Sequence, residues 1–233
     1  MRLLVTRPAE DAAPFARTLE AAGHVVLCEP MLDIRPLPAG PLDLDAVAAV
    51  LLTSANGARA LAAATDRRDL PVYAVGDRTA ALARAAGFAD VTSAAGDAAA
   101  LARLIRAHRR PADGPLVHAA GLDRAGDLAG ALTAAGFEVR VLPLYDAVPA
   151  RAFSAPTRTA LQDGALDGVL LMSPRTARQF ARLLDQAGLA SAAARLDAYC
   201  LSGEVASALD GTGFRAIHVA ARPTSDSLVA ALG

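Results

Sequence analysis

VYAVGDRTAALARAAGF, from Val72 to Phe88, decides the fold of this chain. Its first four residues are apolar and predict a short strand, Gly76 predicts a turn, and the residues after it predict a helix. Asp77 and Thr79 stand where a helix needs polar partners for its free N–H groups, so we expect them to cap it. The turn also suits an anionic ligand, because the N–H groups and the helix dipole favour negative charge. Most such turns in α/β proteins bind nothing, so this one by itself indicates fold more strongly than function.

The same stretch returns near the C-terminus, as AYCLSGEVASALDGTGF over residues 198–214, and the two align without a gap. Two further segments repeat in the same order. Residues 115–146 align with residues 2–33, and LLMSPRTARQF at 170–180 aligns with LLTSANGARAL at 51–61. Each copy predicts five strands alternating with helices, and short repeated βα units are typical of parallel, doubly wound sheets. We therefore expect an internally duplicated α/β protein.

Two extended, proline-rich segments, at residues 30–38 and 143–149, occupy the same place in each copy and are predicted to be linkers. They leave two domain divisions open. A cut near Arg110 gives two consecutive domains, and composition slightly favours it. If instead the two linkers run side by side, the first two strands of each copy complete the sheet of the other copy.

Composition narrows the class of protein. The 233 residues are 54% hydrophobic, which supplies core for one large domain or two small ones. A net charge of −1 offers no basic surface to nucleic acid or to an anionic membrane. Cys28 and Cys200 each lie in an apolar strand and are predicted to be buried thiols of a reducing compartment. Without a signal peptide or a span of ~20 apolar residues, the sequence predicts a soluble, cytoplasmic protein.

Several kinds of catalytic site are missing. All 23 basic residues are arginine, which excludes a lysine Schiff base, a pyridoxal-phosphate anchor and a Walker-type phosphate loop. There is no GxSxG, HExxH or CxxC motif and no GxGxxG after a strand. His118 lies inside a predicted strand and is interpreted as a core residue rather than a base. We therefore expect no metal and no cofactor.

Polar residues collect after the predicted strands, where open α/β sheets bind ligands. Each one alone is more typical of a helix cap, but two sheets facing each other would direct all of them at one cleft. The candidates are Thr6, Arg7, Ser54, Asn56, Gly76, Thr79, Gly96 and Asp97 in the first copy, and Gly121, Arg124, Ser173, Arg175, Ser202, Gly203, Thr224 and Ser225 in the second.

Tyr145 differs from these candidates because it interrupts the second linker, LPLYDAVP. The aligned residue of the first linker is Leu32, so the duplication itself did not require a phenol. A tyrosine packing the hinge and a tyrosine donating a hydrogen bond to a reacting group are equally compatible with this position.

At these residues the chain resembles the uroporphyrinogen-III synthase family, and the resemblance covers essentially its whole length. It rests on VTRP at the start, LLTSANGARAL, VYAVGDRTAALARAAGF, the linker with Tyr145, LLMSPRTARQF and the final SDSLVAAL. Each motif is short, and their order and spacing make the match specific.

The resemblance implies two flavodoxin-like domains with parallel sheets, joined by two crossing extended linkers, with the active site in the cleft. It favours the second division, which assigns residues 1–34 with 148–233 to one domain and 35–147 to the other. It also implies a cyclising lyase of heme biosynthesis, working without metal or cofactor, and we expect a monomer. The substrate would be hydroxymethylbilane, a linear tetrapyrrole polycarboxylate.

In that family the terminal hydroxyl leaves as water, and the azafulvene so formed is attacked by the substituted carbon of the last pyrrole. The resulting spiro intermediate fragments and recloses with ring D inverted. Because spontaneous closure gives the uninverted isomer, the main task is positioning. Matching motifs carry over Ser54, Thr79, Tyr145 and Ser173, with Tyr145 and Thr79 as the catalytic pair.

The chain departs from the family at one turn. Many relatives have a Gly-Pro-Thr-Thr type of turn where this chain reads Ser202-Gly203-Glu204-Val205, so the counterpart of Thr79 is Val205 and lacks a hydroxyl. Two other functions stay open on the sequence. One is a non-catalytic, two-domain protein that closes around a small ligand, and the other, less favoured, is a nucleotide-dependent oxidoreductase.

Overall fold

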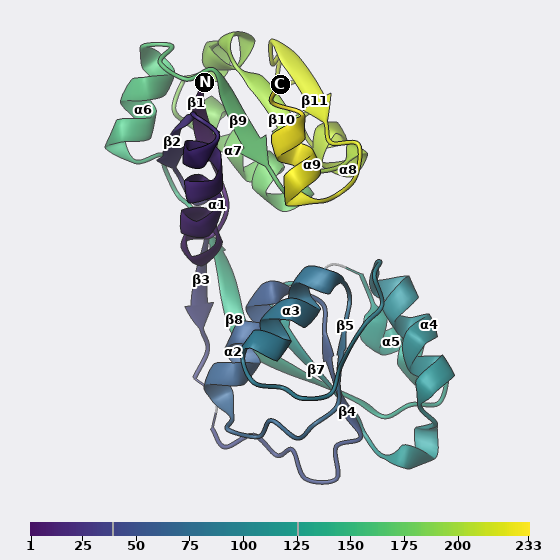
Figure 1. The fold of residues 1–233 in the computed structure, drawn as a ribbon. Helices are drawn as coiled ribbons and strands as arrows, with labels where there is room; N and C mark the ends of the chain where they lie inside the picture. Colours follow the sequence, from purple (N-terminus) through teal and green to yellow (C-terminus); the bar gives the residue numbers. More distant parts are fainter. Residues whose placement is uncertain (39, 125) are drawn as a thin grey trace. The chain divides into compact units, whose positions relative to one another are not determined.

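A computed structural model describes residues 1–38, 40–124 and 126–233 (Figure 1). The contacts between residues divide the chain into two compact units. Unit 1 consists of Met1–Asp33 and Val148–Gly233, and unit 2 of Ile34–Ala147. Each is an α/β unit built on a sheet whose registered strand pairs are parallel.

Unit 1 contains a five-stranded sheet in the order β11-β10-β9-β1-β2. Its strands are β1 (Arg2–Val5), β2 (Val25–Cys28), β9 (Gly168–Leu171), β10 (Asp197–Cys200) and β11 (Ala216–Val219). Helices α1 (Ala9–Ala21) and α9 (Ser225–Ala230) cover one face. The other face packs against α6 (Ala155–Gln162), α7 (Pro174–Gln186), α8 (Gly203–Ser207) and the 3-10 helix η2 (Ala190–Arg195). The central strand β9 is buried on both faces, as a parallel sheet between helix layers requires.

Unit 2 contains a six-stranded sheet in the order β3-β8-β7-β4-β5-β6. Its strands are β3 (Leu32–Pro36), β4 (Ala49–Leu52), β5 (Val72–Ala74), β6 (Val91–Ser93), β7 (Leu116–Gly121) and β8 (Val139–Pro149). One face packs against α2 (Ala55–Ala64) and α3 (Asp77–Ala85), and the other against α4 (Ala98–His108) and α5 (Leu128–Thr133) (Figure 1). The 3-10 helix η1 (Pro111–Asp113) precedes β7. The two predicted linkers, β3 and β8, are hydrogen-bonded neighbours in this sheet.

The two sheets use matching registers. Leu3 of β1 lies beside Gly168 of β9, and Leu116 of β7 lies beside Ala49 of β4. In the aligned segments of the sequence, Leu116 corresponds to Leu3, and the alignment of 170–180 with 51–61, continued two residues back, makes Gly168 correspond to Ala49. Each sheet therefore combines strands from both halves of the chain in the same order.

Local sequence explains most element boundaries. Phe15, Leu19 and Ala22 at helical spacing predict a helix that Gly23 ends. This helix is α1, and Gly23 follows it with a φ of 84°, a left-handed conformation that glycine adopts without strain. Residues 55–64 also predict a helix. It is α2, whose first turn is capped by Ser54. The continuous apolar run from Ala46 to Thr53 predicts a buried strand. The strand, β4, begins only at Ala49, because Ala46 adopts a φ of 56° in a turn.

Two expectations at the level of single side chains are wrong. The N-cap of α3 is Gly76, and neither Asp77 nor Thr79 caps it, because the Asp77 carboxylate accepts a hydrogen bond from Ser93 Oγ at 2.7 Å and Thr79 lies inside the helix. The Cys28 thiol is exposed rather than buried, because β2 is an edge strand with a neighbour on one side only. Cys200 of β10 is buried as expected, and burial raises the pKa of its thiol to about 11.

Across the described residues, we find no helix with the length and apolar character needed to span a membrane.

Candidate active site

The Tyr145 phenol is held at the end of the unit 2 sheet. Tyr145 belongs to β8 and is 8% exposed, and its hydroxyl lies 2.9 Å from Ser54 Oγ. Ser54 lies two residues after the end of β4 and is the N-cap of α2, where its Oγ accepts a hydrogen bond from the Gly57 N–H at 3.0 Å. A serine hydroxyl has one hydrogen and two lone pairs, so Ser54 can accept from Gly57 and still donate to a phenolate oxygen. The arrangement brings together two predicted site residues that are 91 positions apart in the chain.

Gly121 provides the space in which the Tyr145 ring lies. It is the last residue of β7 and pairs with Tyr145 after a register shift that leaves Leu144 as an extra residue of β8. A Cβ atom on Gly121 would lie 2.9 Å from both Cε2 and Cζ of the ring. The backbone carbonyl of Tyr145 also accepts a hydrogen bond from the Leu122 N–H at 2.9 Å. The glycine predicted to contact substrate therefore contacts Tyr145.

A second polar pair joins Thr53, the first residue after β4, to His118 of the neighbouring strand β7. Thr53 Oγ1 is 3.0 Å from His118 Nε2, and His118 is 3% exposed. Burial, and to a smaller extent the positive charge of Arg124, lower the pKa of His118 to about 4. The imidazole is therefore neutral at neutral pH, and it is a core residue as predicted. Within the described part of the chain, its buried Nδ1 has no hydrogen-bond partner.

The stretch from Val72 to Phe88 places Gly76 and Thr79 at the start of α3. This helix lacks a side-chain cap among the described residues, and Thr79, at 6% exposed, lies in its first turn. The corresponding turn of unit 1 places Ser202 before α8, again without a side-chain cap from the described residues. These two helix starts differ from those of α2 and α7, which Ser54 and Ser173 cap.

The candidates at the end of β1 are engaged within unit 1. Thr6 is buried and donates its hydroxyl hydrogen to the Leu170 carbonyl at 2.7 Å. Arg7 is 8% exposed, donates to Ser225 Oγ at 2.8 Å, and has its guanidinium 4.5 Å from the centre of the Phe15 ring. Both side chains connect elements of unit 1.

The remaining candidates are more accessible. Arg124 is exposed in the segment after β7, and Arg175 is half-buried in the first turn of α7. Asn56, in the first turn of α2, accepts a hydrogen bond from Arg59 at 3.0 Å. Ser173 has its Oγ hydrogen-bonded by the Thr176 N–H at 3.2 Å. These residues lie at the carboxyl ends of strands in their own units, as the sequence predicts.

Sequence reasoning missed Glu29, a 5% exposed carboxylate between β2 and β3. It accepts hydrogen bonds from the Ser154 N–H at 3.0 Å, from Ser154 Oγ at 2.5 Å and from Thr157 Oγ1. These donors surround the N-terminus of α6, where the helix dipole favours a negative charge. The local sequence offers one signal, a glutamate between two apolar strands. Glutamate is rarely buried unless partners stabilise its charge.

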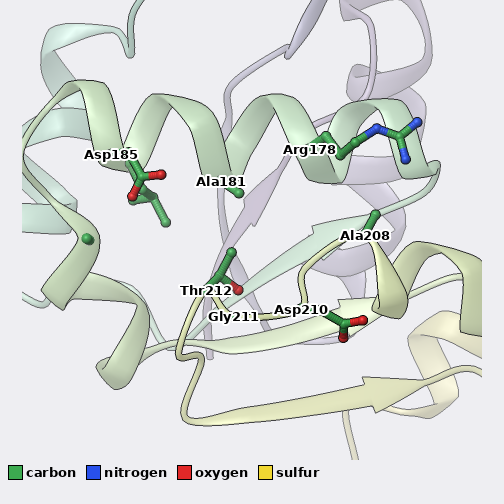
Figure 2. Close-up of a pocket in the computed structure, with 9 residues that line it drawn as sticks. Arg178, Ala181, Asp185, Ala208, Asp210, Gly211 and Thr212 are labelled. Carbon is green, nitrogen blue, oxygen red and sulfur yellow. The ribbon is translucent and has the colours of Figure 1, made fainter.

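Unit 1 also has a pocket of about 320 Å³ between α7 and the segment after α8 (Figure 2). Arg178, Ala181 and Asp185 of α7 lie on one side, and Ala208, Asp210 and Thr212 on the other. None of the residues predicted to bind substrate lines it. In the described part of the chain, no group of three or more histidine, cysteine or acidic side chains could hold a metal ion.

Parallel sheets between helix layers define an α/β protein. In open α/β sheets, ligands commonly bind at the carboxyl ends of the strands. The family model described as Uroporphyrinogen-III synthase HemD matches residues 13–230. The chain therefore belongs to the uroporphyrinogen-III synthase family, which confirms the resemblance and makes the protein a cyclising lyase of tetrapyrrole biosynthesis.

Solved structures of the family are similar in fold. A mutant uroporphyrinogen III synthase from the extremely thermophilic bacterium Thermus thermophilus is 20% identical and matches with a TM-score of 0.59, covering 100% of this chain and 98% of its own. Uroporphyrinogen-III synthetase from Helicobacter pylori is 15% identical, with a TM-score of 0.65 and coverage of 99% and 97%. At these identities the likeness shows a shared α/β fold. A search of curated proteins found no match.

Proposed function

We propose that Tyr145 is the general acid with which this enzyme releases the terminal hydroxyl of hydroxymethylbilane as water. The observation that carries the proposal is the 2.9 Å contact between the Tyr145 hydroxyl and Ser54 Oγ. A phenol is protonated at neutral pH, so it can give a proton to a departing hydroxyl, whereas an ionised carboxylate cannot. Ser54 in turn can donate to the phenolate that remains.

The proton and electron balance of this step is simple. The C–O bond breaks while the phenol proton moves to the leaving oxygen, and the pyrrole nitrogen supplies the electron pair that forms the azafulvene. Water leaves, and the phenolate, hydrogen-bonded by Ser54, regains a proton when the pyrrole nitrogen loses its own. The substituted carbon of ring D then attacks, and the spiro intermediate recloses with ring D inverted. Positioning of the chain ends decides which carbon attacks.

Substrate carboxylates are bound by many separate donors. The starts of α3 at Gly76 and Thr79, and of α8 at Ser202, support this proposal, because no side chain of the described residues caps either helix. Asn56, Arg124 and Arg175 add polar and charged donors after strands of their own units. A net charge of −1 gives no long-range attraction for a polyanion, so local contacts of ~0.3–1 kcal/mol per helix terminus share the binding.

The finer architecture belongs to the same proposal. Numbered in chain order, the unit 1 strands β2-β1-β9-β10-β11 read 2-1-3-4-5, which is the flavodoxin-like order. The unit 2 strands β8-β7-β4-β5-β6 read the same when β7 and β8, the counterparts of β1 and β2 in the aligned sequence, are counted first. Matching registers support a duplication in which each copy lends its first two strands to the other sheet. We take unit 1 and unit 2 as the two domains, joined by β3 and β8. A monomer acting in the cytoplasm without a cofactor is in keeping with the sequence.

The experiment is an isomer assay. Freshly prepared hydroxymethylbilane is incubated with the purified protein, and the porphyrins are oxidised and separated. We expect the inverted isomer III to exceed the spontaneously formed isomer I, and Tyr145→Phe to return the mixture toward isomer I. A parent protein that leaves the isomer ratio of the blank unchanged would remove the proposed reaction. A phenylalanine variant as active as the parent would remove Tyr145 from it.

A further inference from the structure

Tyr145 and Ser54 are not on adjacent strands. The sheet order is β8-β7-β4, so Tyr145 of β8 is separated from the end of β4 by the whole width of β7. Two strand spacings amount to about 9.6 Å. For the hydroxyl to reach Ser54 Oγ at 2.9 Å, the ring must extend across the end of β7. The residue of β7 at this place is Gly121.

The backbone at Gly121 does not itself require glycine, since its φ is not among the left-handed values found for ten other glycines of the chain. The requirement is one of space. An added Cβ would stand 2.9 Å from Cε2 and Cζ of Tyr145 and 3.2 Å from its hydroxyl oxygen. Contacts below 3.0 Å force one group to move, and here the group that moves carries the phenol.

The other half of the chain shows the same position without the phenol. In the aligned segments, Leu32 takes the place of Tyr145 and Pro8 the place of Gly121. The counterpart of Ser54 is Ser173, whose Oγ lies 3.0 Å from Thr176 Oγ1 of its own helix. The glycine and the phenol thus occur together in one copy and are both absent from the other.

We propose that Gly121 is a positioning residue of the active site: its missing side chain lets the Tyr145 ring lie across β7 and places the hydroxyl on Ser54. This inference rests on the proposed role of Tyr145 as the acid. Gly121 itself touches neither substrate nor the reacting atoms. It sets where the acid stands, and a displacement of about 1 Å at such a group is enough to cost ~10²-fold in rate.

The position of the phenol can be measured without substrate. The chain has three tyrosines and no tryptophan, so labelling tyrosine with ¹³C at Cζ gives three signals, of which Tyr145→Phe identifies one. Gly121→Ala and Ser54→Ala should each shift the Tyr145 signal and leave the Tyr73 signal in place. The matched control is Gly168→Ala, whose Cβ would lie 2.8 Å from Cε2 of Tyr199. It imposes a clash on a tyrosine of unit 1, beside a contact of 3.2 Å with the Asp197 carbonyl oxygen, and should shift only the Tyr199 signal.

Activity then tests the consequence. Gly121→Ala should lower kcat ~10²-fold, as Tyr145→Phe does, with little change in KM, while Gly168→Ala stays within about twofold of the parent. The double variant Gly121→Ala with Tyr145→Phe should be no slower than either single variant, because both remove the same positioned proton donor. Independent losses that multiply in the double variant would overturn the proposal, as would an unchanged Tyr145 signal in Gly121→Ala.

Two further outcomes are distinguishable. If Gly121→Ala does not fold, adding Tyr145→Leu, the residue of the other linker, should restore the thermal transition, because the clash is with the ring. Failure of that rescue would contradict the proposal. If the parent protein has no isomerising activity, the proposed reaction fails, while the shift of the Tyr145 signal still decides whether Gly121 positions the ring.

Discussion

His118 makes the stability of unit 2 depend on pH. In the folded protein burial lowers the pKa of this imidazole from its ordinary value of 6.5 to about 4. The unfolded chain therefore takes up a proton near pH 6.5, whereas the folded chain resists it until about pH 4. Stability contributed by the neutral imidazole is complete above pH 6.5 and is lost progressively as the pH falls from 6.5 to 4. The full loss is about 3 kcal/mol, since each pKa unit is worth about 1.36 kcal/mol.

The comparison variant is His118→Val, because valine stands at the aligned position of β1, Val5. Urea unfolding at about pH 7.5 and about pH 4 should show the parent losing about 3 kcal/mol more than the variant. All other acidic and basic groups change the unfolding free energy of parent and variant equally, so their effects cancel in this difference. Because the chain divides into two compact units, the ¹³C signals of Tyr73 for unit 2 and Tyr199 for unit 1 should be followed individually. The effect is expected at Tyr73 alone.

An NMR titration of the four histidines gives the pKa directly, with the variant identifying the His118 signal. Thr53 Oγ1 lies 3.0 Å from His118 Nε2, and the positive charge of Arg124 disfavours protonation of the imidazole. Neither side chain is a carboxylate that could stabilise the protonated form. A His118 signal that titrates near 6.5, or equal losses of unfolding free energy in parent and variant between pH 6.5 and 4, would refute the reasoning.

Three further outcomes are expected. Tyr145→Phe should fold normally and lower kcat ~10²-fold or more with product affinity retained, and turnover at the parent rate would reduce Tyr145 to a packing residue. Arg7→Ala should lower the unfolding free energy of unit 1 by about 2 kcal/mol in urea unfolding, because it removes the bond to Ser225 and the contact with Phe15; intact stability with lost substrate binding would return Arg7 to the binding site. Glu29→Gln should destabilise unit 1 by ~1–3 kcal/mol in the same assay, because three charge-assisted hydrogen bonds become neutral ones; an unchanged midpoint would show that they contribute nothing.

Sequence alone predicted the parts of this molecule that short-range patterns specify. The strand and helix around Gly76, the helix after Ser54 and the end of α1 before Gly23 all follow from apolar runs and turn residues. Errors arose where a local pattern had two readings. Asp77 fits a cap by composition, yet its carboxylate accepts from Ser93 on the neighbouring β6, a partner that only the folded sheet provides.

The connections within the site could not be predicted in the same way. Ser54 and Tyr145 were each named as site residues, but nothing in the sequence places their oxygens in contact or puts Gly121 beneath the ring. Glu29 was missed because its donors, Ser154 and Thr157, are 125 and 128 positions away. Such pairs depend on strand order, and strand order is decided by tertiary packing.

Unit 1 is built from two separate segments of the chain, Met1–Asp33 and Val148–Gly233, and this affects how the protein is made. β1 and β2 are synthesised first, but the inner neighbour of β1 is β9, at Gly168–Leu171. The ribosome produces every strand of unit 2 before that neighbour exists, so unit 2 can close while the N-terminal βαβ segment still has an open edge. Until β9 is made, that edge can pair with other nascent chains.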